Sequence, residues 1–374
     1  MANPKRKMAT IRRVTDITPI EGADRIELAH VGGWQCVVGK GEYEPGDLCV
    51  YYEIDSFMPT DDERYAFLAD RGTTKMVIDG EEVVGHKLRT AKLRGVYSQG
   101  LLMKPEAVMP EGIPAYRYAE MCDEGLDVSK LVNVCEYYKP LPAMNAGFIG
   151  RYDPWVAPRT DAERAQNINQ ETFDLIKRTE YEVSVKVDGT SITMLFDDRI
   201  NGFRAFSHNN EFGLESGMGK LVYDCAKAQG LVDFCEANHM ISLQAELCGP
   251  KIQSDRLGLG KHRLFVFSVW EIEGMRYVSH EELGFYDNSK FVYDSHVPIL
   301  DLDLDQFDTT NDLLEWVDGI KGNVTKGRLD EGVVVHIYGR GDLDSEEWQK
   351  LRSTLETTMQ VKAVSNRFLL KAKD

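Results

Sequence analysis

The sequence predicts an α+β protein in which a small N-terminal β-barrel precedes a larger α+β domain with mostly antiparallel sheets. The chain of 374 residues is too long for one ordinary core, so two domains are expected. Residues 8–110 consist of short β-prone runs separated by turn residues, and helical patterns become frequent only after residue 160. Strands in the second part are not separated by regular crossover helices, which favours antiparallel pairing.

Short strands joined by tight turns make up the first part. The run 25–31 alternates apolar and polar residues with the period of a half-buried strand. Gly32 and Gly33 separate it from the β-prone run 34–38, so a hairpin is expected. Strands of this number and spacing fit a closed barrel of the OB type. Further strands are predicted at 48–54, 87–93 and 100–103, the last two as a pair flanking a turn at 94–99, and a helix-like signal lies at 63–69.

A stretch rich in proline and glycine separates the two parts. We place an OB-fold domain at 1–140, an ordered connector at 141–159 and the second domain at 160–374. The connector carries Phe148, Tyr152 and Trp155, which are expected to be buried.

Helices and strands are mixed in the second part. Thr160 and Glu163 match a capping box, which predicts a short helix over 160–166. Further helices are predicted at 170–178, 219–238 and 310–320, and strands at 182–187, 193–196, 242–247, 264–271 and 332–337.

Composition excludes several classes of protein. Hydrophobic content of 43% is that of a folded chain, and no apolar run approaches the roughly 18 residues of a membrane span. The N-terminus lacks the apolar segment of a signal peptide, so a cytoplasmic location is expected. The seven cysteines contain no Cys-x-x-Cys pair, which argues against a disulfide framework and a structural zinc site.

The net charge of −17 argues against a protein that coats nucleic acid, but phosphate binding needs only a local basic surface. Basic residues do cluster in the first part, at 5–13 (Lys5, Arg6, Lys7, Arg12 and Arg13) and at 87–94. In the second group Arg89, Lys92, Arg94 and Tyr97 are candidates for nucleic-acid binding, or for an ordinary solvated surface.

The run 186–190, Lys-Val-Asp-Gly-Thr, carries the central chemical signal. It follows a β-prone strand, so Lys186 stands at a strand end and Asp188-Gly189 forms a turn. A lysine there can point into a pocket while Gly189 lets a phosphate approach the backbone. Alone, the same run also fits an exposed hairpin turn with a solvated lysine.

The residues that follow this run in order are harder to explain as ordinary surface. Glu246 lies in an apolar strand, Phe267 in an aromatic strand at 265–271, Glu331 at the mouth of a valine-rich strand, and Lys362 near the C-terminus. This order resembles motifs I, III, IIIa, IV and V of the covalent nucleotidyltransferases, the polynucleotide ligases and messenger-RNA capping enzymes.

The first part adds specificity to this resemblance. Residues 18–28 and 93–101 resemble the OB module that precedes the catalytic domain in the fifth family of RNA ligases, and residues 160–167 resemble the segment before its motif I. An OB module placed first distinguishes the chain from ordinary DNA ligases and capping enzymes. The resemblance implies an ATP-grasp-like ligase fold for the second domain.

The resemblance also implies roles for individual residues. Lys186 would attack the α-phosphorus of ATP to give lysyl-AMP, and Lys362 would stabilise charge on the α-phosphate. Mg²⁺ or Mn²⁺ would be held through its water shell by the acids. The implied metal ligands are Asp188, Glu246 and Glu331, and the implied nucleotide-binding residues are Arg164, Val185, Lys186, Gly189, Glu246, Phe267 and Lys362.

Three positions depart from the family pattern. His208 stands where motif Ia often has arginine, Ser268 where motif IIIa often ends in aspartate, and Gln360 where motif V often has a further lysine. These changes concern efficiency or the choice of partner more than the covalent step.

The expected function is ATP-dependent sealing of 5′-phosphate to 3′-hydroxyl ends, with RNA nicks in duplexes as substrates, consistent with RNA repair. No membrane and no obligate protein partner are implied. Three alternatives stay open: a capping-type guanylyltransferase that uses GTP, a DNA ligase, and, in another class, a noncatalytic OB-fold RNA-binding protein.

Overall fold

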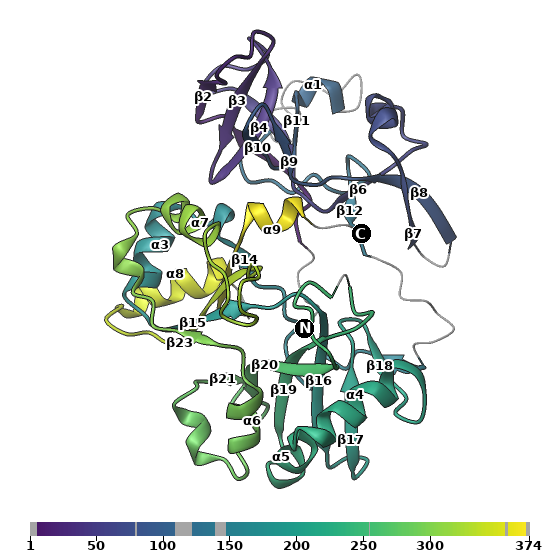
Figure 1. The fold of residues 1–374 in the computed structure, drawn as a ribbon. Coiled ribbons are helices and arrows are strands. Elements are labelled where there is room, and N and C mark those ends of the chain that lie inside the picture. The colour runs from purple at the N-terminus through teal and green to yellow at the C-terminus, as the bar shows by residue number, and fades with distance from the viewer. Residues whose placement is uncertain are drawn as a thin grey trace. The chain divides into compact units, whose positions relative to one another are not determined.

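The computed structural model describes residues 6–78, 81–108, 122–138, 147–253, 255–355 and 358–371 (Figure 1). The chain divides into two compact units, one formed by residues 4–141 and the other by residues from 142 onward. The predicted boundary at residue 140 lies in 139–146, outside the described residues. No helix in the described ranges is long and apolar enough to span a membrane.

The first unit is built almost entirely of short strands. The predicted hairpin is confirmed as β3 (Ile26–Val31) and β4 (Trp34–Gly39), with Val31 opposite Trp34 across the two glycines. The central strand β5 (Leu48–Tyr52) pairs with β1 on one side and β11 on the other. The other elements of this unit are β1 (Ala9–Arg13), β2 (Asp16–Pro19), β6 (Ser56–Pro59), β7 (Thr74–Ile78), β8 (Glu81–Lys87), β9 (Ala91–Leu93), β10 (Val96–Ser98), β11 (Leu101–Met103), β12 (Cys135–Glu136), the 3-10 helix Glu63–Arg71 and α1 (Pro105–Val108).

The predicted pairing of 87–93 with 100–103 is wrong. Instead β9 pairs with β10, inside the segment predicted as a turn, and β11 joins β5. Arg94 and Gly95 both have positive φ, 48° and 89°, which is the geometry of the two-residue turns that connect hairpins. Arginine seldom adopts that conformation, so the sequence indicated a longer turn at 94–99 and not a two-residue turn at Arg94 and Gly95.

The basic cluster at 5–13 is only partly available for phosphate. The Arg6 guanidinium lies 2.5 Å from Glu53 and 2.5 Å from Glu136, and its side chain is mostly buried. Arg13 pairs with Glu124 at 3.2 Å on the surface. Lys5 lies outside the described residues. Arg6 therefore stabilises the first unit and does not belong to an exposed basic surface.

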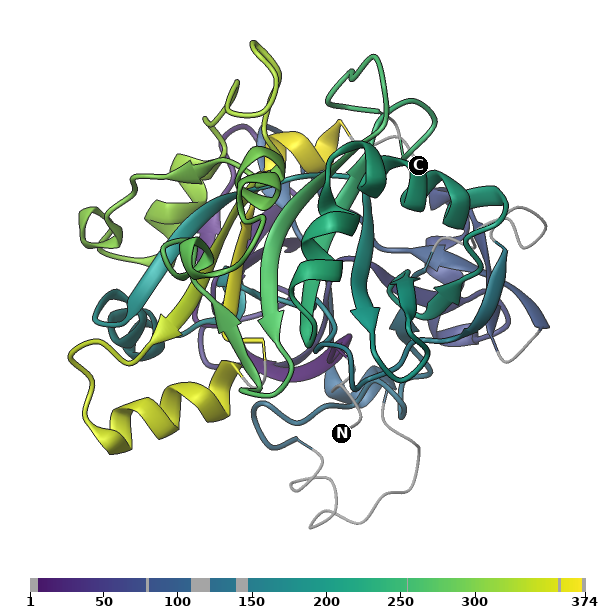
Figure 2. The ribbon, with the colours of Figure 1, turned by 90° about the horizontal axis from the view of Figure 1, so that it is seen from below.

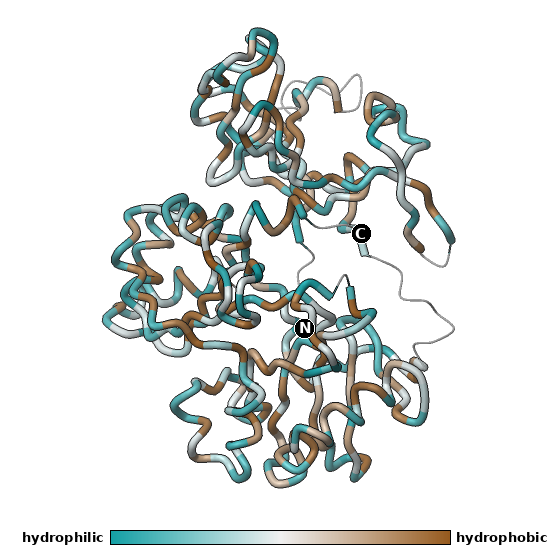
Figure 3. The backbone as a smooth tube through the Cα atoms, viewed as in Figure 1, coloured by the Kyte–Doolittle hydropathy of each residue, from teal (hydrophilic) through white to brown (hydrophobic). Residues whose placement is uncertain are grey.

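Two mostly antiparallel sheets form the second unit. The larger has the order β13-β18-β17-β16-β19-β20-β21, and the smaller β14-β24-β23-β15-β22. In Figure 3 the hydrophobic stretches recur along the strands and alternate with hydrophilic turns. The strands of this unit are β13 (Phe148–Arg151), β14 (Glu163–Arg164), β15 (Glu180–Lys186), β16 (Thr190–Asp197), β17 (Gly202–Phe206), β18 (Asn210–Phe212), β19 (Ile241–Cys248), β20 (Arg263–Glu271), β21 (Arg276–Val278), β22 (Ile299–Leu300), β23 (Gly332–Gly339) and β24 (Gln360–Val364).

Helices cover one face of each sheet (Figure 2). On the larger sheet, α4 and α5 share a core with β16, β19 and β20. On the smaller sheet, α3, α7 and α8 share a separate core with β15, β23 and β24. The opposite face of the larger sheet carries a smaller apolar cluster with Leu195, Phe206 and Trp270, and also buried polar residues such as Gln244. The helices are α3 (Gln170–Lys177), α4 (Gly217–Ala228), α5 (Leu231–Ala237), α6 (Lys290–Ser295), α7 (Thr310–Val317), α8 (Ser345–Leu355) and α9 (Asn366–Leu370).

Two helix predictions need correction. The helix expected over 219–238 is broken at Gly230, which has φ 74° and lies against the Phe291 ring, so α4 ends and α5 begins there. The helix expected over 160–166 does not form. The Glu163 carboxylate accepts from the Arg164 amide and from Asn167 and does not close a capping box, and β14 pairs with β24 instead. Tertiary pairing overrides the local signal there.

The segment predicted as a connector belongs to the second unit from residue 148 onward. Strand β13 pairs with β18 at the edge of the larger sheet. Tyr152 is buried as expected, but Trp155 is 38% exposed, with the Arg199 guanidinium 3.9 Å from its ring centroid. The prediction that Trp155 is buried is therefore wrong, because a cation covers the ring in place of apolar side chains.

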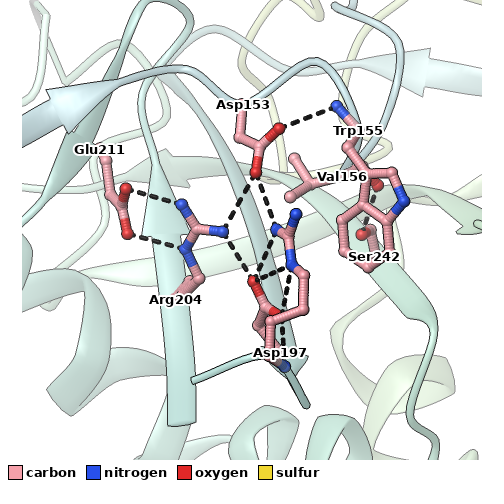
Figure 4. Close-up of polar contacts among 8 residues, drawn as sticks. Asp153, Trp155, Val156, Asp197, Arg204, Glu211 and Ser242 are labelled. Atoms are coloured by element: carbon pink, nitrogen blue, oxygen red, sulfur yellow. Dashed lines mark hydrogen bonds and ion pairs between the residues drawn. The ribbon is translucent and has the colours of Figure 1, made fainter. Parts of the chain in front are cut away.

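An ion-pair network holds this segment on the sheet (Figure 4). Asp153 accepts from Arg199 and Arg204, and both arginines also bind Asp197, whose side chain is fully buried. Arg204 completes its pairing with Glu211 at 2.8 Å. Each charge in this group thus has a partner of opposite sign, and this pairing offsets the cost of burying Asp197 and Arg204.

Candidate active site

Lys186 lies at the end of β15, where the chain turns into β16. Its Nζ is 2.9 Å from Oε2 of Glu331, which directly precedes β23. The register places Lys186 opposite Gly332, so the two strand ends meet. A Cβ on Gly332 would collide with the backbone of Ala363 in β24, and only glycine permits this close packing of strands. The sheet thereby brings together two residues that are 145 positions apart.

Asp188 and Glu246 complete an acidic pocket around Lys186. Glu246 lies on β19, which pairs with β16 just after the turn that carries Asp188. Burial raises the pKa of Glu246 to about 8, against the attraction of Lys186 and with the repulsion of Glu331 and Asp188. Burial and the Glu331 charge raise the pKa of Asp188 to about 6. Burial and mutual repulsion therefore both oppose full ionisation of these acids, and a bound cation would favour it.

The same carboxylates control the charge of Lys186. Burial lowers its pKa, but Glu331, Glu246 and Asp188 together outweigh burial and raise it. The structure shows that desolvation is not enough, so a neutral, nucleophilic Lys186 needs added positive charge beside the carboxylates.

The three acids suit a hydrated divalent cation. Carboxylate oxygen is the donor that Mg²⁺ and Mn²⁺ prefer, and the raised pKa values of Asp188 and Glu246 reflect burial first and mutual repulsion second, both of which a cation would offset. In the described ranges no three acidic, histidine or cysteine side chains converge closely enough to enclose a bare ion. The residues therefore fit an ion that keeps much of its water shell.

Lys362 and Arg164 lie in one row across the smaller sheet. Lys362 pairs in register with Arg164 of β14 and with Val334 of β23, and Val334 pairs with Ser184. Ser184 and Lys186 are two positions apart on β15, so they share a face of the sheet. Lys362 is half-buried and Arg164 is buried. Both cations thus stand on the polar face that carries the lysine.

A β-bulge sets the position of Phe267. The register passes from Ser268 opposite Gln244 to Val266 opposite Ala245, so Phe267 has no partner on β19. A bulge turns its extra residue away from the regular alternation. Phe267 is half-buried beside Val187 and remains a candidate for stacking on adenine.

The two remaining nucleotide-pocket candidates have structural roles that the sequence did not show. A Cβ on Gly189 would press on the Leu247 carbonyl and lie 2.7 Å from Cys248 Sγ, so this glycine lets the turn pack on β19. Val185 is buried, and its amide donates to the Pro298 carbonyl at 2.9 Å. Its side chain faces away from Lys186, so only its backbone could contact a nucleotide.

Two of the unusual positions bind each other. The Gln360 amide donates to Ser268 Oγ at 3.1 Å, and both side chains are buried. This bond links the polar faces of the two sheets. The third position, His208, lies 3.8 Å from the Asp161 carboxylate. A neutral pair therefore stands where the family pattern has an aspartate and a lysine.

Sequence reasoning missed Arg256. It lies in the loop between β19 and β20, and its Nε is 3.5 Å from Oδ2 of Asp188. A single arginine in a loop has no periodic pattern or motif spacing, so nothing in the sequence marked it.

Comparison with known proteins places these features in context. An OB-fold domain model matches residues 8–105, and an RNA ligase family model matches residues 179–351. A Naegleria gruberi RNA ligase, solved as a glutamate-to-alanine variant with ATP and Mn, is 30% identical with a TM-score of 0.78, over 99% of this chain and 100% of that chain.

Two further structures of the Naegleria gruberi RNA ligase are similar to this chain. A lysine-to-methionine variant with AMP and Mn is 29% identical with a TM-score of 0.77, over 98% of this chain and 99% of that chain. The ligase with PPi is 30% identical with a TM-score of 0.75, over 98% of each chain. No curated protein matches the chain.

Proposed function

The chain belongs to the RNA ligase family and is an ATP-dependent RNA ligase, and from this premise we propose that it joins 5′-phosphate to 3′-hydroxyl RNA ends through a lysyl-AMP intermediate on Lys186. The observation that carries the proposal is the position of Lys186 Nζ, 2.9 Å from Glu331 in a pocket shared with Asp188 and Glu246. A half-buried amine among three acids supports a functional site, because an ordinary surface lysine has no such surroundings.

In the first step the Lys186 amine attacks the α-phosphorus of ATP. A P–N bond forms, the bond to the bridging oxygen breaks, and pyrophosphate leaves. Glu331 is in position to take the proton that the amine gives up. Asp188, Glu246 and Glu331 would hold a divalent cation, whose positive charge would favour the neutral amine and screen the phosphates. Lys362 and Arg164 stabilise negative charge on the α-phosphate from the same sheet face.

In the next two steps the RNA ends react in turn. The adenylate moves from Lys186 to the 5′-phosphate, which regenerates the amine. The 3′-hydroxyl then attacks the activated phosphate, a phosphodiester forms and AMP leaves. In-line positioning and charge neutralisation provide most of the catalysis in such transfers. The ATP, AMP and PPi named with the Naegleria gruberi structures are the substrate and products of these steps, which supports the proposal.

The first unit offers a surface for the RNA strand. The β9–β10 hairpin places Lys92 opposite Tyr97, and the Lys92 ammonium lies 5.3 Å from the tyrosine ring centroid. A cation and an aromatic ring side by side suit a phosphate and a base of a nucleic acid. We propose that this hairpin, with Arg89 and Arg94, contacts nicked duplex RNA.

Nucleotide labelling separates the proposed function from its alternatives. The protein is incubated with α-labelled ATP or GTP and Mg²⁺, and adducts are resolved on a denaturing gel. Label from ATP is expected; label from GTP alone would indicate a capping-type enzyme. RNA binding without any adduct would indicate the noncatalytic alternative.

Sealing assays then test the substrate. Nicked duplexes that differ only in having RNA or DNA at the 3′-hydroxyl strand are compared under the same conditions. Faster sealing of the RNA strand is expected, and equal or faster sealing of DNA would contradict the proposed substrate.

A further inference from the structure

Arg256 holds an unusual position beside the acidic pocket. Its Nε lies 3.5 Å from Oδ2 of Asp188, and both side chains are largely shielded from solvent, at 16% and 25% exposure. Nε is buried and makes no hydrogen bond. The pair is therefore held by charge attraction without the hydrogen bonds that make an arginine–carboxylate pair strong.

The rest of the Arg256 side chain is firmly placed. Nη1 donates to the Phe368 carbonyl at 3.0 Å, and the guanidinium lies 4.1 Å from the Phe368 ring centroid in α9. The Arg256 carbonyl accepts from Arg328 at 2.6 Å. The guanidinium thus has its own supports and does not depend on Asp188 for its position.

The loop that carries Arg256 has an irregular backbone. Lys251, Gln253 and Asp255 have positive φ, at 66°, 46° and 43°, a region that side chains other than glycine seldom adopt. Such conformations persist where the surroundings impose them and are common at functional sites.

We propose that Arg256 is the counter-cation of Asp188 in the metal-free site, and that a divalent cation competes with it for this carboxylate. The inference rests on the proposed role of Asp188 as a metal ligand. Lys186 pairs with Glu331 and Arg256 with Asp188, so the chain itself neutralises two of the three acids. A guanidinium within a few ångströms of a divalent cation repels it, so the charge of Arg256 weakens metal binding at Asp188.

This proposal gives Arg256 an effect opposite to that of a supporting residue. If Arg256 merely held Asp188 in place, its loss would weaken metal binding. Under competition, loss of its charge strengthens metal binding. The sign of the change therefore distinguishes the two roles.

The test measures binding of Mn²⁺ without ATP, from the electron paramagnetic resonance signal of free Mn²⁺. Arg256→Gln removes the charge at similar size, and is expected to bind Mn²⁺ more tightly by on the order of tenfold, the effect of removing one like charge near a partly exposed site. Arg256→Lys keeps the charge and is expected to bind as the wild type does. An Arg256→Gln variant that binds Mn²⁺ no more tightly than the wild type overturns the proposal.

Two further variants keep the outcome interpretable. Arg256→Ala also lacks the charge, so it should reproduce the effect of Arg256→Gln even if the glutamine variant has a folding defect of its own. Thermal unfolding without metal confirms that each variant is folded. Asp188→Asn tests the premise. If it binds Mn²⁺ as well as the wild type, the metal role of Asp188 fails; if it binds weakly while Arg256→Gln is unchanged, only the inference about Arg256 fails.

Discussion

Replacing Gly189 with alanine is expected to slow formation of the lysyl-AMP adduct while leaving the protein folded. A Cβ there would lie 2.7 Å from Cys248 Sγ and 2.9 Å from Glu246 Cγ, and closer still to the Leu247 carbonyl, whereas ordinary contacts begin near 3.4 Å. Because backbone cannot yield as a flexible side chain does, the turn with Lys186 and Asp188 must move away from β19.

The size of the effect follows from this overlap. Overpacking of this kind costs about 1–3 kcal/mol of the free energy of unfolding. The melting temperature should then fall by roughly 2–4 °C for each kcal/mol in a unit of this size. A displacement of about 1 Å at a reacting group costs on the order of 100-fold in rate. The rate of adduct formation should therefore fall by a much larger factor than the fraction of folded protein.

Single-turnover labelling with α-labelled ATP measures the rate, and circular dichroism measures folding. Gly260→Ala is the matched control, because a Cβ on Gly260 meets no atom within 4 Å and its φ is not in the left-handed region. A Gly189→Ala variant that forms adduct at the wild-type rate would refute the reasoning. Equal losses in both alanine variants would refute it too, because the close approach to β19 would then not be the cause.

Three further predictions concern stability. Burial lowers the pKa of His336 to about 3, below the value of about 6.5 in the unfolded chain. The stability linked to the neutral His336 is therefore present above pH ~6.5 and is lost as the pH falls toward 3, by up to about 1.4 kcal/mol per pH unit. Urea unfolding of wild type and His336→Gln at several pH values checks this, and an equal pH dependence of the two proteins would contradict it. Asp197→Ala should cost about 1.5–3 kcal/mol, because it removes a fully buried carboxylate that accepts from Arg199 and Arg204 while both arginines keep Asp153. Lys220→Ala, from an exposed pair, should cost less than about 1 kcal/mol. Similar losses in urea unfolding would be inconsistent with a stabilising role for the buried carboxylate. Gln360→Lys alone buries an unpaired charge and should lower the free energy of unfolding. Adding Ser268→Asp should restore at least about 1 kcal/mol of that free energy in a double-mutant cycle. Strict additivity of the two changes would show that the two side chains do not interact.

Local patterns predicted much of the fold because they agree with the tertiary structure. The period-two run and paired glycines at 25–38 formed the expected hairpin, and the strands carrying Lys186, Glu246 and Glu331 lie where their β-prone runs predicted them. The order of the motifs also indicated that these residues meet, and the sheet register shows how.

The errors arose where long-range contacts decide the local structure. The capping-box signal at Thr160 did not produce the expected helix, because Glu163 and Arg164 pair with β24 and tertiary context overrides local propensity. The bulge at Phe267 depends on the register of two strands, which the sequence of one strand does not contain. Arg256 is brought to Asp188 by an irregular loop, and irregular loops have no period to recognise.

The most direct measurement is adduct formation by wild type and Lys186→Ala with α-labelled ATP and Mg²⁺. We expect the folded wild type to carry AMP through an acid-labile, alkali-stable phosphoramidate, and the folded variant to carry none. A labelled Lys186→Ala protein, or a folded wild type that takes up no label from ATP, would contradict the central role of this lysine.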